Sequence, residues 1–255
     1  MDLTLLEGHA IAMLMHLVRA GAFLSVVPFF GRQRDSFFLR LILSVSLGSM
    51  FWWNGQHTIA VPSSLVELTV VAAGECLIGF ALGFALSLLT AMLSSAGEIV
   101  SNEMGFAMAR ALDPDSGGSS SVVAQLFQIF GFLLVLQLNI HHEALRILQQ
   151  TFEACPIGEP FRIEPMWLGI QAMVGGGVVC ALQYAFPLLA VMLLLTVGLV
   201  LFGRAVPNVN LMEFSFTIRV LVAMIAAIYF LSAGTPFLER TFESFLVTTR
   251  SMFPV

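Results

Sequence analysis

The sequence predicts an all-α protein of the membrane type, built from long apolar helices that pair as hairpins. The first observation is the stretch Met166–Gly203, which runs for 38 residues without Asp, Glu, Lys or Arg. About 20 apolar residues in a helix are enough to cross the hydrocarbon layer of a bilayer. The second is composition: charged residues make up 11% of the chain, whereas soluble domains average about 25%. The third is that other uncharged runs precede the long one: Leu41–Val66, Cys76–Gly97 and Ser116–His142.

The apolar runs predict six long helices. In order, these helices are expected at about 10–30, 37–53, 65–95, 122–140, 166–203 and 211–237. Pro28 ends the first, because proline cannot continue a helix. Trp52 and Trp53 end the second, at the headgroup level that amphipathic rings favour. The third contains Gly79 and Gly83, a spacing that lets two helices approach closely.

Charged and turn-rich connections separate the later helices. A mixed-charge helix is expected at 141–153, and a loop follows at 155–160. The segment 166–203 contains Gly175–Gly177 and Pro187, the two places where a bend can form. That segment is long enough for one tilted crossing or for two crossings. The positive-inside rule therefore leaves the orientation open. After the sixth helix we expect a tail carrying Arg240 and Arg250.

The central tract Gly97–Ser121 is the least apolar part of the first half. Residues 97–112 have a helical pattern with polar side chains on one face. Pro114 and the paired glycines of Asp113–Ser121 then break the helix. A Gly/Ser segment rearranges at low energetic cost. At membrane depth, irregular backbone must line a cavity or be buried in protein.

Composition excludes several function classes. The chain has no Lys, and a P-loop ATPase needs a Lys on the phosphates. The net charge of −5 and the scattered arginines argue against free nucleic-acid binding. The motif His141-His142-Glu143 is followed by Arg146, where a zinc protease would need its second His. We therefore expect no enzyme activity, no metal and no cofactor.

Two carboxylates suggest an alternative function. Glu67 and Glu75 lie eight positions apart in the third predicted helix, near the same face. Ionisable residues inside a membrane are functional candidates. A self-contained transporter or proton channel that uses these residues is thus the competing hypothesis from a different class.

Four stretches of the chain carry a family resemblance. The most specific is Ala96–Phe106, which runs into Asp113-Pro114. The other three are Arg19–Arg32, Cys155–Pro160 and Arg204–Asn210. In these stretches, which together span nearly the whole chain, the sequence resembles the FliR family, the R subunit of the flagellar export gate, whose injectisome relatives are called SctT. The resemblance favours a flagellar export protein over a virulence injectisome protein, which stays open as an alternative.

The resemblance implies a place in an assembly. Proteins of this family join P-type and Q-type subunits in a helical pore in the bacterial inner membrane, at the flagellar basal body. A B-type switch subunit and other export components accompany the pore, and unfolded protein substrates pass through it. Residues 1–165 are then expected to look like a P-type subunit and residues 166–255 like a Q-type hairpin.

The resemblance also implies site residues. A loop at about 105–121 is expected to plug the closed pore. The residues expected to close the pore are Met104, Gly105, Phe106, Met108, Arg110, Asp113, Pro114, Gly117 and Gly118. The residues expected at subunit contacts are Arg19, Arg32, Pro187, Arg204, Pro207, Glu213 and Arg219.

Overall fold

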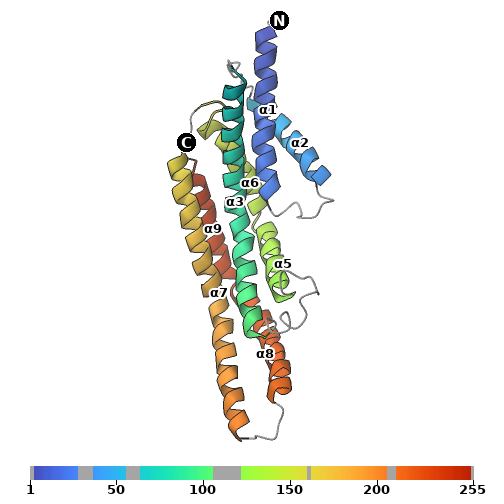
Figure 1. Ribbon diagram of the computed structural model, residues 1–255, viewed down its shortest axis with the longest axis vertical. Helices are drawn as coiled ribbons and strands as arrows, with labels where there is room; N and C mark the ends of the chain where they lie inside the picture. Colours follow the sequence, from blue (N-terminus) through green and yellow to red (C-terminus); the bar gives the residue numbers. More distant parts are fainter. Residues whose placement is uncertain are drawn as a thin grey trace. The chain divides into compact units, whose positions relative to one another are not determined.

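The computed structural model confirms an all-α chain over the residues that it describes (Figure 1). These residues are 3–27, 37–55, 64–105, 122–159, 162–205 and 211–253. The helices are α1 (Leu3–Val26), α2 (Phe37–Gly55), α3 (Leu65–Glu103), α5 (Val122–Gln137), α6 (Ile140–Ala154), α7 (Ile163–Ala205), α8 (Leu211–Ala233) and α9 (Thr235–Ser251).

Each predicted helix has its counterpart, with two informative differences. The long segment at 166–203 is a single uninterrupted helix, α7, of 43 residues, or about 64 Å at 1.5 Å per residue. The expected tail is wrong, because residues 235–251 form the helix α9. Charged residues interrupt the apolar sequence of this helix, Glu239, Arg240 and Glu243 among them. A search for apolar runs therefore does not detect it.

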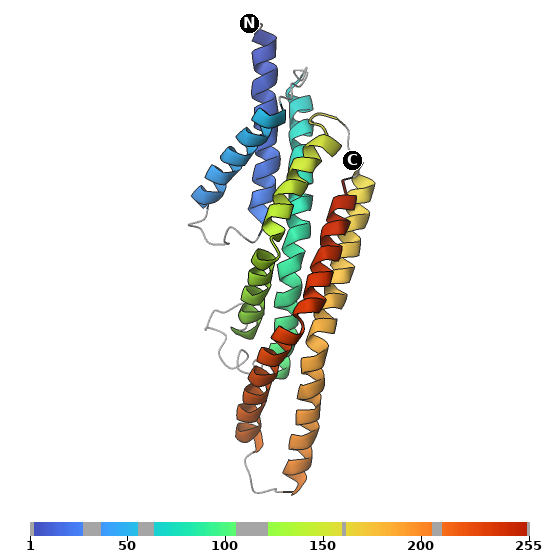
Figure 2. The same cartoon turned by 180° about the vertical axis from the view of Figure 1, so that it is seen from behind.

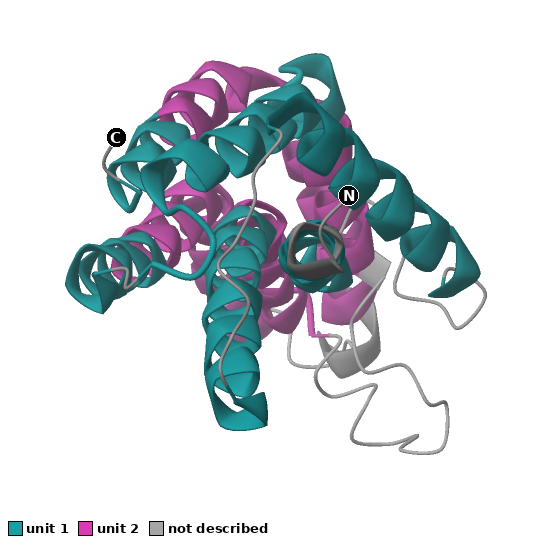
Figure 3. Ribbon diagram, turned by 90° about the horizontal axis from the view of Figure 1, so that it is seen from above, with its two compact units in different colours: residues 1–88, 135–174, 244–255 teal, residues 89–134, 175–243 magenta. Residues whose placement is uncertain are grey.

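Contacts along the chain define two compact units, which Figure 3 colours separately. Unit 1 comprises Met1–Leu88, Val135–Val174 and Ser244–Val255. Unit 2 comprises Leu89–Leu134 and Gly175–Glu243. The predicted division near Pro165, which concerns likeness to P-type and Q-type subunits, stays a prediction.

In unit 1, small residues bring α1 close to α2 and α3 (Figure 1). A Cβ added at Gly48 of α2 would lie 2.6 Å from Leu17 Cδ2. A Cβ at Gly83 of α3 would lie 2.7 Å from the carbonyl oxygen of Phe23, and one at Gly79 would lie still closer to that of Arg19. These glycines are therefore packing sites, as the spacing of Gly79 and Gly83 predicts.

The end of α9 completes unit 1. Figures 1 and 2 show it beside the start of α7. Met252 packs on Gly169, and the Thr249 hydroxyl lies 3.6 Å from Met173 Sδ. Glu143 of α6 forms ion pairs with both Arg146 and Arg250.

In unit 2, the second part of α3 packs against α5, and α7 packs against α8. A Cβ at Gly97 would lie 2.7 Å from the Cα of Ala124. Phe127 of α5 meets Tyr184 of α7 edge to face, with ring centroids 6.1 Å apart. The Tyr184 hydroxyl donates to the carbonyl of Leu231 at 3.4 Å.

Five described helices are long and apolar enough to cross a membrane: α1, α2, α3, α7 and α8. Helices α5 and α6 would count as a sixth span if they are taken together, although they are bent by 67°. The bend occurs beside Asn139, whose φ of 55° is left-handed, a conformation that Asn tolerates better than most residues.

Much of the apolar surface of α7 and α8 is uncovered by the chain itself. Within the apolar window of each of these two helices, 17% of the residues are buried, against 61% for α3. Large exposed side chains on them include Phe186, Leu194, Ile225 and Ile228. A surface of this extent requires lipid or other protein chains to cover it.

Candidate functional site

The described structure reaches the start of the predicted pore-closing loop. Helix α3 ends at Glu103, and Met104 is buried beside it. Gly105 has a φ of 92°, and its N–H donates to the carbonyl of Asn102 at 3.1 Å. Glycine adopts this left-handed conformation without strain and commonly ends helices in this way. Helix α3 therefore ends just before Gly105, and residues 106–112 of the predicted helical stretch lie outside the described residues.

The α3 terminus lies against α8 within unit 2. A Cβ added at Gly105 would lie 3.6 Å from the ring of Phe216. The rest of the predicted loop, with Phe106, Met108, Arg110, Asp113, Pro114, Gly117 and Gly118, lies outside the described residues. The structure describes the two residues that precede this segment. Met104 is buried, and Gly105 turns the chain through its positive φ.

A buried arginine is the main polar feature of unit 1. Arg19 of α1 is 0% exposed, and Glu75 of α3 is 3% exposed. Arg19 Nε donates to Glu75 Oε2 at 2.5 Å. A charged side chain in an apolar interior is tolerated only when it is paired and hydrogen-bonded. This ion pair joins α1 to α3.

Arg19 also reaches α6 and the loop that follows it. Its Nη1 donates to the carbonyl of Thr151 at 2.7 Å, and its Nη2 donates to the carbonyl of Cys155 at 2.9 Å. The guanidinium carbon lies 4.3 Å from the ring centroid of Phe152, within the range of a cation–π contact. His16 stacks on the same ring at 4.6 Å. All three nitrogens of the guanidinium are thereby bound, and three segments meet at one side chain.

The loop after α6 packs against the Arg19 cluster, the group formed by His16, Arg19, Glu75, Thr151 and Phe152. Gly158 has a φ of 83°, as in turns that need glycine at their third position. Its backbone N–H hydrogen-bonds Glu75, while Glu159 N–H donates to the carbonyl of Pro156 at 3.2 Å. Burial raises the pKa of the Cys155 thiol, an effect that Arg19 reduces and Glu75 adds to. A thiol with a raised pKa stays protonated, and a protonated thiol is a poor nucleophile.

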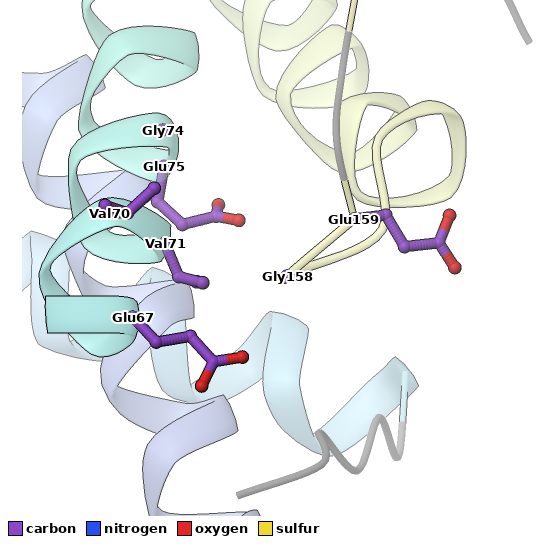
Figure 4. A pocket seen from close by; sticks show the side chains of 7 residues that line it. All are labelled: Glu67, Val70, Val71, Gly74, Glu75, Gly158 and Glu159. Atoms are coloured by element: carbon purple, nitrogen blue, oxygen red, sulfur yellow. The ribbon is translucent and has the colours of Figure 1, made fainter. Parts of the chain in front are cut away.

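An acidic pocket of about 440 Å³ lies between α3 and this loop. Figure 4 shows the Glu67 and Glu75 side chains extending from α3 toward Gly158, whereas Glu159 points away from the helix. Glu75 forms an ion pair with Arg19. Glu67 and Glu75, the two carboxylates that the alternative function would use, therefore lie in different surroundings. The lining residues are Glu67, Val70, Val71, Gly74, Glu75, Gly158 and Glu159. Within the described part of the chain, no group of three His, Cys, Asp or Glu residues could hold a metal ion.

The residues expected at subunit contacts lie on several elements of the chain. Arg19 is enclosed by its own chain. Pro187 lies inside α7, and Arg204 is exposed at the end of that helix. Arg219 of α8 is half-buried, and its Nε is enclosed without a hydrogen-bond partner. Arg32, Pro207 and the Glu213 side chain lie outside the described residues.

The partners of Arg19 were not found by sequence reasoning. Charges of opposite sign in neighbouring apolar helices are a signal for an ion pair, and Arg19 of α1 with a carboxylate of α3 fits that signal. No sequence signal points to the backbone carbonyls of Thr151 and Cys155, because any residue can supply a carbonyl oxygen. The contact of Phe152 with the guanidinium was likewise hidden among 23 phenylalanines.

Comparisons with known proteins support the resemblance stated above. The chain is 24% identical to the flagellar biosynthetic protein FliR of Bacillus subtilis, over 94% of both chains. It is 25% identical to the FliR of Aquifex aeolicus, over 96% of this chain and 95% of the relative. It is 32% identical to the FliR of Escherichia coli, over 68% of this chain and 66% of the relative.

The family model described as "Bacterial export proteins, family 1" matches residues 10–245. The match covers every described helix in whole or in part, including the Arg19 cluster and the end of α3. The resemblance to the FliR and SctT family is thus confirmed, and the chain belongs to family 1 of the bacterial export proteins.

Proposed function

We propose that this chain is a core subunit of the flagellar type III protein export gate. The observation that carries the proposal is similarity over nearly the full length to proteins named for flagellar biosynthesis, the FliR of Bacillus subtilis among them. The proposed location is the bacterial inner membrane at the flagellar basal body. Five apolar helices among the described residues are long enough to span a membrane and support that location.

In the proposed gate, P-type and Q-type subunits surround the chain, and a B-type switch subunit joins them. The uncovered apolar faces of α7 and α8 support such an assembly, because neighbouring helices can bury them as well as lipid can. Unfolded flagellar proteins are the proposed substrates. The proposal assigns no catalytic step to this chain; energy for transport would come from other components.

The proposed closing element begins at the end of α3. Met104 is buried and Gly105 turns the chain, so the segment that follows starts from a defined anchor. Residues 106–121 would block the pore and move aside at low energetic cost, because glycine and serine restrict the backbone little.

Deletion of Gly117–Ser121 should raise leakage of ions through the assembled gate, because the shortened segment no longer fills the pore. The measurement is the conductance of the purified complex in planar bilayers or liposomes. A variant with Ser119–Ser121 replaced by glycines keeps the length and serves as the control. Unchanged conductance in an assembled deletion variant would count against the plug.

We further propose that Arg219 contacts a neighbouring subunit. Its Nε is enclosed in unit 2 without a partner, and it lies inside an apolar span. A cation in such a place is stabilised by an anion. A carboxylate on a neighbouring helix would supply one, and a lipid phosphate is the competing source.

Changing Arg219 to Leu should weaken recovery of the P-type and Q-type subunits by at least about tenfold, since truncating one partner of a buried charge pair costs about 2–5 kcal/mol. Co-purification with the tagged chain in mild detergent measures this. Arg219→Lys should retain most of the recovery. Arg162→Gln is the matched control, because Arg162 is 81% exposed. Equal recovery for all three variants would contradict the proposal.

The alternative of a self-contained transporter or proton channel draws on the pocket lined by Glu67 and Glu75. A transporter should purify alone, as a monomer or a symmetric oligomer, and Glu75→Gln should abolish proton flux in liposomes. An export-gate subunit should purify with its partner subunits. Recovery with injectisome rather than flagellar components would support the virulence alternative.

A further inference from the structure

Helix α2 has the length of a single membrane crossing and is largely uncovered by the chain. It has 19 residues, or about 28 Å at 1.5 Å per residue, close to the roughly 30 Å thickness of the hydrocarbon layer. In its apolar stretch, 11% of the residues are buried. Helix α7 is about twice as long as that layer is thick. Lipid alone therefore cannot cover α7, whereas it can cover the exposed side of α2.

One side of α2 packs inside its own compact unit. Helices α1 and α2 both belong to unit 1, and Figure 2 shows them crossing. The Ser44 hydroxyl donates to the carbonyl of Leu17 at 3.4 Å, and Gly48 lets the same part of α1 approach closely. Phe51 is 7% exposed, and its ring centroid lies 5.6 Å from that of Phe152 in α6. Ser44, Gly48 and Phe51 thus define the inner face of α2.

The opposite side of α2 presents large apolar side chains. Phe38, Ile42 and Trp53 are 74%, 60% and 78% exposed. The outer face, as we call it, consists of Phe38, Leu39, Ile42, Val45, Met50 and Trp53. An apolar patch of this size needs a cover other than water. Trp53 lies in the last turn of the helix, and an amphipathic ring at that place favours the headgroup level of a bilayer.

Arg40, in the first turn, is the one charged residue of α2. Its Nη1 donates to the carbonyl of Ser25 at 3.4 Å, a long hydrogen bond, and its Nε is enclosed without a partner. Among the described residues, no carboxylate forms an ion pair with Arg40. A guanidinium without a counter-charge is costly in hydrocarbon. Because helical side chains tilt toward the N-terminus, Arg40 extends toward the start of α2 and so toward the membrane surface.

We propose that the outer face of α2 contacts lipid acyl chains and that Arg40 binds the phosphate of an anionic phospholipid. Arg40 then lies at one headgroup layer and Trp53 at the other. The two residues are about 20 Å apart along the helix axis, and the reach of their long side chains extends this span toward the hydrocarbon thickness. A phosphate accepts hydrogen bonds from a guanidinium with particular strength. The inference rests on the proposed membrane location and not on the export function.

Tryptophan fluorescence in liposomes with brominated acyl chains tests the outer face, because bromine quenches only indoles that touch lipid. The native tryptophans, Trp52, Trp53 and Trp167, are first replaced by phenylalanine in the full-length chain. Phe38→Trp, at an exposed position, should then be strongly quenched. Phe51→Trp is the matched control, since it makes the same chemical change on the inner face, and it should be protected. Equal quenching at the two positions overturns the assignment of the faces.

The same measurement separates lipid from a protein partner. It is made on the chain purified with the subunits that accompany it and on the chain alone. A partner on the outer face would protect the Phe38→Trp indole in the assembly and leave it quenched in the lone chain, which overturns the proposal. Protection in both forms also overturns it. If the chain has no accompanying subunits and its outer face is quenched, the export-gate proposal fails and the lipid contact stands.

Arg40 is tested by the choice between two brominated lipids at equal mole fraction, phosphatidylglycerol and phosphatidylcholine. The anionic lipid should associate beside the Phe38→Trp indole about fivefold more strongly, the usual effect of one basic residue at a membrane surface. Arg40→Gln should abolish this preference, and Arg40→Lys should retain most of it. Arg162→Gln, at a residue that is 81% exposed, should leave it unchanged. Equal association of both lipids, or a preference that survives Arg40→Gln, overturns the phosphate site.

Discussion

Replacing Arg19 with methionine is expected to lower the free energy of unfolding by about 3–5 kcal/mol, the usual cost of leaving a buried charge without its partner. The variant leaves Glu75 buried at 3% exposure without a cation. It also removes the donors to the carbonyls of Thr151 and Cys155. The midpoint of thermal unfolding of the purified chain in detergent measures the loss.

A double variant separates the ion pair from the other bonds. Arg19→Met with Glu75→Leu should recover part of the lost stability, because replacing both charges with apolar groups removes the unpaired carboxylate. Recovery should stay incomplete, since the two carbonyls still lack their donors. Arg162→Gln is the control on an exposed, weakly paired arginine and should change nothing measurable. If Arg19→Met were as stable as the control, the cluster would have no structural role.

Replacing Gly79 with alanine is expected to cost about 1–3 kcal/mol, as overpacking of a close contact does. The new methyl would collide with the carbonyl oxygen of Arg19 and lie 3.0 Å from the backbone nitrogen of Phe23. Backbone atoms cannot rotate away, so α1 must move off α3. That movement would also stretch the bond between Arg19 and Glu75.

Unfolding midpoints of Gly79→Ala and Gly198→Ala provide the measurement. Gly198 has nothing within 4 Å, so alanine there should leave stability unchanged or raise it by up to about 1 kcal/mol. The same chemical change should thus lower the free energy of unfolding at Gly79 but not at Gly198. Equal midpoints would contradict the close approach of α1 and α3.

The helices could be predicted from the sequence because charges are rare in them. Long apolar runs with few charges mark α1, α2, α3, α5, α7 and α8, and the bounds of these helices lie within a few residues of the prediction at most ends. Helix α9 was missed because its mixed charges remove the apolar signal, although its pattern is amphipathic. The end of α3 depends on a left-handed Gly105, and a glycine alone does not reveal its φ.

The Arg19 cluster shows why site geometry was harder to predict. Arg19 and Glu75 are 56 positions apart, and Thr151 is 132 positions from Arg19. Glu67 was an equally good carboxylate on sequence grounds, since it shares a helix with Glu75. Only the depth of each residue along the packed helices decides which carboxylate meets the arginine. That depth depends on the register of α1 along α3. The glycines of these helices permit their close approach but do not specify the register.

The ion pair between Glu143 and Arg250, 107 positions apart, bears on how the chain is made. During synthesis, α6 leaves the ribosome long before residues 244–255 exist. Every segment of unit 2 is translated before those residues. The unit that starts first is therefore the last that can be completed, and its contacts with residues 244–255 form only when translation has nearly ended.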